Sequence, residues 1–207
     1  MKLRVDRGTA LIVVDVQKDF CSGGNLPVPD GDAVVPVLNE YIRIFEKAEA
    51  PVFATRDWHP LNHVSFKAQC GPWPLHCVQE SAGAEFLEDL RLPEDVVIVS
   101  KGMGQDSMGY SGFDGSSLEA ELRLRGVRTL FVGGLAMDYC VKATVLEALS
   151  RGFGVVLLVD AVKGVDSEGS RLAIEEAVSR GAQRATLSEL ERDGRSRRCG
   201  FRVGVDG

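Results

Sequence analysis

Short aliphatic runs alternate with amphipathic stretches along nearly the whole chain of 207 residues. Most of these runs are continuous in Val, Ile and Leu, which is typical of strands covered on both faces in a parallel sheet. They predict six strands, at Thr9–Asp15, Pro51–Arg56, Asp95–Lys101, Val127–Gly133, Phe153–Val159 and Gln183–Leu187.

The stretches between the strands have helical periodicity and predict helices at Ala33–Ala48, Ser117–Arg125, Asp138–Arg151 and Ser167–Arg180. The last three are followed by Gly126, Gly152 and Gly181, where a left-handed residue ends a helix. Asp138 and Ser167 are expected as N-caps. The alternation predicts an α/β protein with a three-layer α/β/α fold around a central, mainly parallel six-stranded sheet.

One domain is expected over residues 1–190, because neither an internal repeat nor a Pro- or Ser-rich linker divides the chain. Residues 191–207 are polar, rich in Gly and Arg, and are predicted to form a C-terminal extension. The net charge of −6 lacks the basic footprint that nucleic acid requires. No apolar run approaches the ~18 residues of a membrane span, so we expect no membrane partner.

The amino terminus lacks the apolar stretch of a signal peptide. The five cysteines are an odd number without a disulfide-framework spacing. Both observations favour a reducing cytoplasm, where each cysteine packs in the core or serves chemistry.

Polar side chains mark the ends of predicted strands: Asp15 closes the first, Lys101 closes the third, and Cys140 follows the fourth. If these parallel strands are neighbours, the three side chains share one crevice. A nearby ammonium and a helix N-terminus favour the thiolate, while a carboxylate can move a proton from the thiol to a leaving amine. The spacing also allows the alternative of solvated strand ends and a core cysteine.

All three histidines fall within residues 59–76, in one of two long loops, 57–83 and 102–115, that follow predicted strands. Asp57 and His59 lie on the same side of an extended segment, and one carboxylate with two imidazoles suits a divalent metal. Spacing does not decide between His63 and His76 as the third ligand, and chance clustering of loop histidines is the alternative.

A glycine-containing turn, Gly133–Cys140, lets the backbone approach a ligand, and the helix that follows offers N–H groups to an oxyanion. Its spacing matches neither a dinucleotide fingerprint nor a P-loop, so nucleotide binding is not expected.

Several blocks resemble the signature blocks of nicotinamidases, the pyrazinamidase-like members of the isochorismatase-like cysteine hydrolases. The blocks are Asp15–Phe20, Thr55–His63, Gly71–Gln79, Ser100–Gly102, Tyr110–Phe113 and Gly134–Val141. The resemblance runs from about residue 9 to residue 188 and implies the isochorismatase-like hydrolase fold. Met137 departs from the pattern, because Thr is frequent at that position of the family's turn, and this change is expected to affect pocket shape or rate.

The resemblance implies hydrolysis of nicotinamide to nicotinate and ammonia through a thioester on Cys140. Asp15 is then the proton shuttle and Lys101 the partner of the thiolate. A cis peptide between Leu135 and Ala136 is implied, which aims the N–H groups of Ala136 and Cys140 at the oxyanion.

The resemblance further implies one divalent metal ion, zinc before iron or manganese, and a homo-oligomer. The implied metal ligands are Asp57, His59 and His76, with His63 close by or as a fourth ligand. The implied substrate-binding residues are Phe20, Trp73, Tyr110 and Leu135. Two other readings are a sister hydrolase acting on another small amide, a carbamoyl compound or a vinyl ether, and a non-enzymatic interaction protein. Such sister hydrolases usually lack the full metal block, and an interaction protein has no need of Asp15, Lys101 and Cys140 together.

Overall fold

The computed structural model describes residues 3–190, so the predicted extension 191–207 lies outside the described residues. Its six strands are β1 Thr9–Val14, β2 Val52–Asp57, β3 Val97–Lys101, β4 Thr129–Gly134, β5 Gly154–Val162 and β6 Gln183–Ala185. They form one sheet in the order β3-β2-β1-β4-β5-β6, in which every neighbouring pair is parallel. The predicted sheet is confirmed, and it is parallel throughout.

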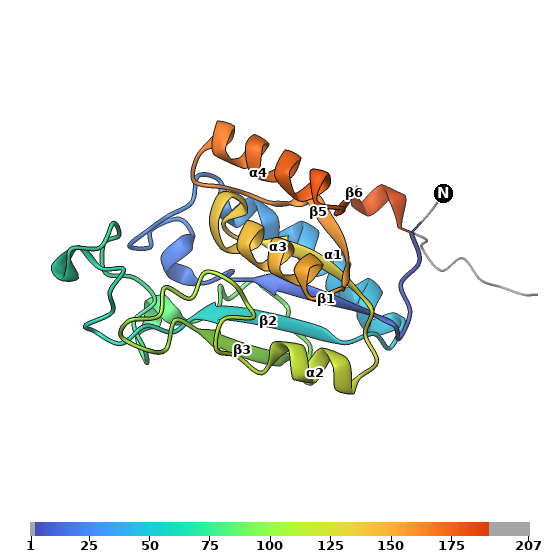
Figure 1. Ribbon diagram of the computed structural model, residues 1–207, viewed down its shortest axis with the longest axis horizontal. Coiled ribbons are helices and arrows are strands. Elements are labelled where there is room, and N and C mark those ends of the chain that lie inside the picture. Colours follow the sequence, from blue (N-terminus) through green and yellow to red (C-terminus); the bar gives the residue numbers. More distant parts are fainter. Residues whose placement is uncertain (1–2, 191–207) are drawn as a thin grey trace, which may run out of the picture.

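Helices cover both faces of this sheet (Figure 1). The helices are α1 Val34–Lys47, α2 Leu118–Leu124, α3 Lys142–Ser150 and α4 Ser167–Ser179. Helix α1 packs on one face, while α2, α3 and α4 contribute to the core on the other. The three-layer α/β/α prediction is therefore confirmed. No helix in the described part of the chain is long and apolar enough to cross a bilayer.

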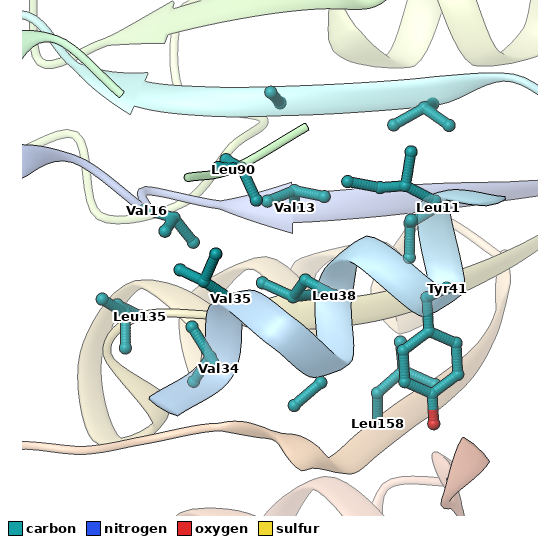
Figure 2. Packing of buried hydrophobic residues seen from close by; sticks show 14 of the residues in the cluster. Leu11, Val13, Val16, Val34, Val35, Leu38, Tyr41, Leu90, Leu135 and Leu158 are labelled. Carbon is teal, nitrogen blue, oxygen red and sulfur yellow. The ribbon is translucent and has the colours of Figure 1, made fainter. Parts of the chain in front are cut away.

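The central strand β1 explains the continuous aliphatic pattern, because all six of its residues are buried. Leu11 and Val13 face α1, where they pack with Leu38 and Tyr41 (Figure 2). Ile12 belongs to the core of the opposite face. A strand that is covered on both sides needs apolar side chains at every position, and so shows no alternation.

Both predicted N-caps are wrong, whereas the predicted start of α4 at Ser167 is confirmed. Asp166 caps α4 in place of Ser167, because its carboxylate accepts a hydrogen bond from the Gly169 N–H. Asp138 caps no helix: it lies inside a π-helical segment, Met137–Val141, that precedes α3. Its carboxylate instead accepts the N–H groups of Val165 and Asp166, which ties this segment to the loop after β5.

The strand order reverses at β1, which has β2 on one side and β4 on the other. In open α/β sheets the ligand crevice lies at such a reversal, beyond the carboxyl ends of the strands. The long loops after β2 and β3 gather at this end of the sheet (Figure 1). The fold therefore directs attention to the ends of β1 and β4.

The variant Leu38→Ala removes a side chain that is fully buried between α1 and the sheet. We expect it to lower the free energy of unfolding by about 2–5 kcal/mol. Leu124→Ala in α2 is the matched control: this side chain is 82% exposed, so we expect a change within about 0.5 kcal/mol. Urea unfolding measures both values. Equal losses in the two variants would contradict the described packing of α1.

Candidate active site

Lys101 is a buried side chain at the end of β3, with 1% of the residue exposed. Its Nζ lies 2.8 Å from Asp15 Oδ2, 2.6 Å from Asp57 Oδ1 and 3.3 Å from Cys140 Sγ. It also donates a hydrogen bond of 2.9 Å to the Gly109 carbonyl. The structure thus brings the predicted carboxylate, ammonium and thiol into one cluster, to which Asp57 adds a second carboxylate.

The register of the sheet explains this convergence. Asp57 and Lys101 are paired directly at the ends of β2 and β3. Asp15 follows β1, the next strand over, and has a positive φ of 49°, which turns the chain out of the sheet. The Thr55 hydroxyl donates to Asp15 Oδ1 at 2.6 Å and fixes the carboxylate. Asp15 Oδ2 contacts Lys101 but accepts no hydrogen bond of good geometry within residues 3–190.

Burial and charge set the protonation states of the cluster. Burial disfavours the ammonium form of Lys101, but Asp15 and Asp57 outweigh it and raise the lysine pKa well above its ordinary value. Burial raises the pKa of Asp15 despite the opposing charge of Lys101. Burial also raises the pKa of Cys140 well above its ordinary value, more than Lys101 lowers it. Lys101 thus favours the thiolate, as the sequence analysis expected, but it does not outweigh burial, so the thiol needs a base to lose its proton.

Asp57, His59 and His76 form a second cluster whose ligand atoms all lie within 4.8 Å of one another. His59 Nδ1 lies 2.9 Å from the Gly102 carbonyl, and His76 Nδ1 lies 2.8 Å from the Pro74 carbonyl. These carbonyls hold a proton on each Nδ1 and leave each Nε2 lone pair available to a metal. One carboxylate oxygen and two imidazole nitrogens fit a divalent cation.

His63 lies beside this cluster, but both of its nitrogens are engaged. Nε2 is 2.6 Å from the Ser107 carbonyl, and Nδ1 is 2.7 Å from the Ser65 hydroxyl. Its ring stacks on His59 at 3.9 Å, and burial lowers its pKa. A neutral ring that donates through one nitrogen and accepts through the other has no lone pair left. The structure therefore favours His63 as a support for His59 over a fourth ligand.

The crevice above Cys140 is lined mainly by apolar and aromatic side chains, among them the predicted residues Phe20, Trp73 and Tyr110. Trp73 Nε1 donates to the Tyr110 hydroxyl at 3.0 Å, which joins the two long loops over the crevice. Leu135 does not line the crevice. It is fully buried and packs in the core beside α1, because the turn directs its side chain inward (Figure 2).

Other lining residues were missed by the sequence analysis: Leu26, Val28, Ser65, Met108, Tyr139 and Val165. Several of them lie in loops that follow β1, β2, β3 and β5. Their position after the ends of predicted strands could therefore have indicated them as lining residues. Ala136, which the resemblance had singled out, also lines the crevice and follows a cis peptide bond to Leu135.

Residues 9–189 match the family model described as the isochorismatase domain. The chain belongs to the isochorismatase family. The matched region contains both clusters and falls within the domain expected over residues 1–190. It also includes every lining residue of the crevice.

Similar proteins share most of the length of this chain. It is 38% identical to the nicotinamidase of Escherichia coli K12, over 88% of this chain and 96% of the relative. The structure of a Pyrococcus horikoshii pyrazinamidase in complex with zinc is 52% identical, with a TM-score of 0.85, over 87% of this chain and 99% of that chain. The structure of PnC1 from L. infantum in complex with nicotinate is 35% identical, also with a TM-score of 0.85, over 92% of this chain and 98% of that chain.

The two histidines beside His59 are predicted to respond differently to the same substitution. In a Zn²⁺ titration followed by calorimetry, we expect His76→Gln to remove a candidate ligand nitrogen and to weaken binding by more than about 100-fold. His63→Gln removes only a supporting ring and should weaken it by about 10-fold to 100-fold, with one ion still bound per chain. Loss of all Zn²⁺ binding in His63→Gln alone would show that His63 is the ligand.

Proposed function

We propose that the chain is a nicotinamidase, a cysteine amidohydrolase that converts nicotinamide and water into nicotinate and ammonia. The observation that carries the proposal is the contact of Lys101 with Asp15 and Cys140, because Cys140 lines an aromatic crevice that Asp57, His59 and His76 also line. The relatives described above, which include nicotinamidases and a nicotinate complex, give independent support.

Asp15 and Cys140 perform the bond exchange in this proposal. Asp15 takes the thiol proton, and Sγ attacks the amide carbon to give a tetrahedral intermediate whose oxyanion faces the N–H groups of Ala136 and Cys140. Asp15 then passes the proton to the amide nitrogen, the C–N bond breaks, and ammonia leaves a thioester on Cys140. Water adds to the thioester with Asp15 as base, the C–S bond breaks to release nicotinate, and Asp15 returns the proton to Sγ, which restores the thiol and the ionised carboxylate.

Lys101 stays protonated throughout this cycle. Its charge opposes the burial that raises the pKa values of Asp15 and Cys140, and so eases formation of the carboxylate and the transient thiolate. Its contacts with two carboxylates and the thiol also hold the reacting groups in place. We assign Lys101 an electrostatic role and no proton transfer.

The aromatic side chains bind the pyridine ring in this proposal, with Phe20 and Trp73 on its two faces and Tyr110 fixed by Trp73. Asp57, His59 and His76 hold the metal ion in this proposal. Zinc is the first candidate for this set of nitrogen and oxygen donors, and iron and manganese are the alternatives. When bound, the cation supplies a Lewis-acid centre for the ring nitrogen of the substrate.

The cellular setting is proposed on narrower grounds. We propose a cytoplasmic setting, which is supported by the absence of disulfides among the four cysteines of the described residues, Cys21, Cys70, Cys77 and Cys140. A homo-oligomer is proposed from the family resemblance alone.

Ammonia release from nicotinamide, other small amides and a carbamoyl compound, together with pyruvate release from isochorismate, tests the proposed function, with elemental analysis of the same preparation. We expect nicotinamide to be the preferred substrate and one divalent ion per chain. Preference for a carbamoyl compound or turnover of isochorismate would instead identify a sister hydrolase.

Cys140→Ala is expected to reduce ammonia release from nicotinamide by about 10⁴-fold or more, because no other group replaces the nucleophile. The fold should persist, since Ala is smaller and also apolar, and circular dichroism checks this. Cys70→Ser, at an exposed thiol, is the matched control and should retain activity. Full turnover in Cys140→Ala would refute the assigned nucleophile.

The pH profile of kcat/KM should follow Asp15 rather than a free thiol. Asp15 acts as base only when ionised, and its pKa is raised, so activity should fall with decreasing pH well before the ordinary carboxyl value of about 4. Because the pKa of Cys140 is raised, we expect no further increase in rate near the ordinary thiol pKa of about 8.5. A rate that climbs through that region would mean that the thiol ionises without Asp15.

A further inference from the structure

Gln17 is a fully buried polar side chain that takes no part in the chemical steps above. It lies two residues after Asp15, where the chain leaves β1. Glutamine is rarely buried completely unless its amide is fully hydrogen-bonded, so its partners indicate its role.

The backbone pairing of β1 with β2 stops just before Asp57. The ladder runs to Val14 and Thr55, and the Asp15 N–H adds a last bond of 3.1 Å to the Thr55 carbonyl. The positive φ of Asp15 then turns the chain away, and the Gln17 N–H folds back onto the Asp15 carbonyl at 2.9 Å. The main chain of β1 therefore does not reach the N–H and C=O groups of Asp57.

The side chain of Gln17 replaces this missing backbone pair. Its Oε1 accepts the Asp57 N–H at 2.8 Å, and its Nε2 donates to the Asp57 carbonyl at 2.8 Å and to the Ala84 carbonyl at 2.9 Å. A primary amide offers the same donor and acceptor as a peptide unit, so it can complete a ladder. Both main-chain groups of one residue are thereby held by one side chain.

Asp57 is the residue whose placement matters most to both clusters. Its Oδ1 lies 2.6 Å from Lys101 Nζ, and its Oδ2 lies 3.4 Å from His59 Nε2 on the side of the metal ligands. We propose that Gln17 is a positioning residue that fixes the backbone of Asp57, so that one carboxylate serves Lys101 and the cation at once. The inference deepens the proposed function, on which it rests for its account of the site.

The test uses Co²⁺ as a probe, because its visible spectrum reports coordination geometry. The metal-free Gln17→Met variant keeps a side chain of similar length and loses all three hydrogen bonds. We expect Co²⁺ to bind about 10-fold to 100-fold more weakly than to the metal-free wild type, with an altered spectrum. Retention of wild-type affinity and spectrum would overturn the proposal, whatever the loss in thermal stability.

Asn39→Leu is the matched control. The Asn39 amide also holds backbone groups, donating to the Asp89 carbonyl at 2.9 Å and accepting the Arg91 N–H at 2.8 Å, but it does not line the crevice. We expect unchanged Co²⁺ affinity and spectrum in this variant. An equal loss of affinity here would mean that general destabilisation explains the effect, and would overturn the proposal.

A second variant covers the case in which Gln17→Met does not fold. Gln17→Asn keeps the amide and withdraws it by one methylene, so weaker Co²⁺ binding supports the proposal and wild-type binding overturns it. Nicotinamide is not needed for these measurements. A wild type that binds Co²⁺ without releasing ammonia would therefore contradict the proposed function and leave the test of Gln17 intact.

Discussion

The organisation of the site depends on one buried cation, the ammonium group of Lys101. An unpaired charge in this position would cost several kcal/mol in lost hydration, so it requires partners. Asp15 and Asp57 provide the opposing charges, and the Gly109 carbonyl accepts a hydrogen bond from the ammonium. Because the two carboxylates repel each other without it, Lys101 makes their proximity tolerable. Lys101 Nζ thus contacts the thiol of Cys140, the carboxylate of Asp15 and the carboxylate of Asp57, and so connects all three groups.

The parallel sheet makes this arrangement predictable in outline. Asp15 and Lys101 were expected to converge because they end predicted strands, and Cys140 because it follows one. Such reasoning needs only the positions of the strands and the rule that their carboxyl ends share an edge. The order of the strands places β2 between β1 and β3, and so adds Asp57 to the same cluster. The contact of Asp57 with Lys101 could not be predicted from the sequence, which indicated Asp57 only as a metal ligand.

The details that could not be predicted depend on contacts between distant segments. The Nε2 atom of His63 is engaged by the Ser107 carbonyl, which lies in the other long loop. The spacing of residues within the loop of His63 therefore does not show whether this nitrogen is available to a metal. Asp138 has the residue type of an N-cap, yet its carboxylate is taken by the N–H groups of the loop after β5. Leu135 has the position of a lining residue, but its side chain packs in the core beside α1. Local pattern identifies these residues, whereas tertiary contacts decide what they do.

The central claim is that Lys101 is a permanent ammonium held by two carboxylates. Nitrogen-15 NMR of the lysine side chains, recorded as a function of pH on the full chain, tests it most directly, with Lys101→Met used to assign the signal. The account predicts that the Lys101 ammonium resonance persists, protected from solvent exchange, above the ordinary lysine pKa of about 10.4. A Lys101 amine that is already neutral below its ordinary pKa of about 10.4 would contradict it.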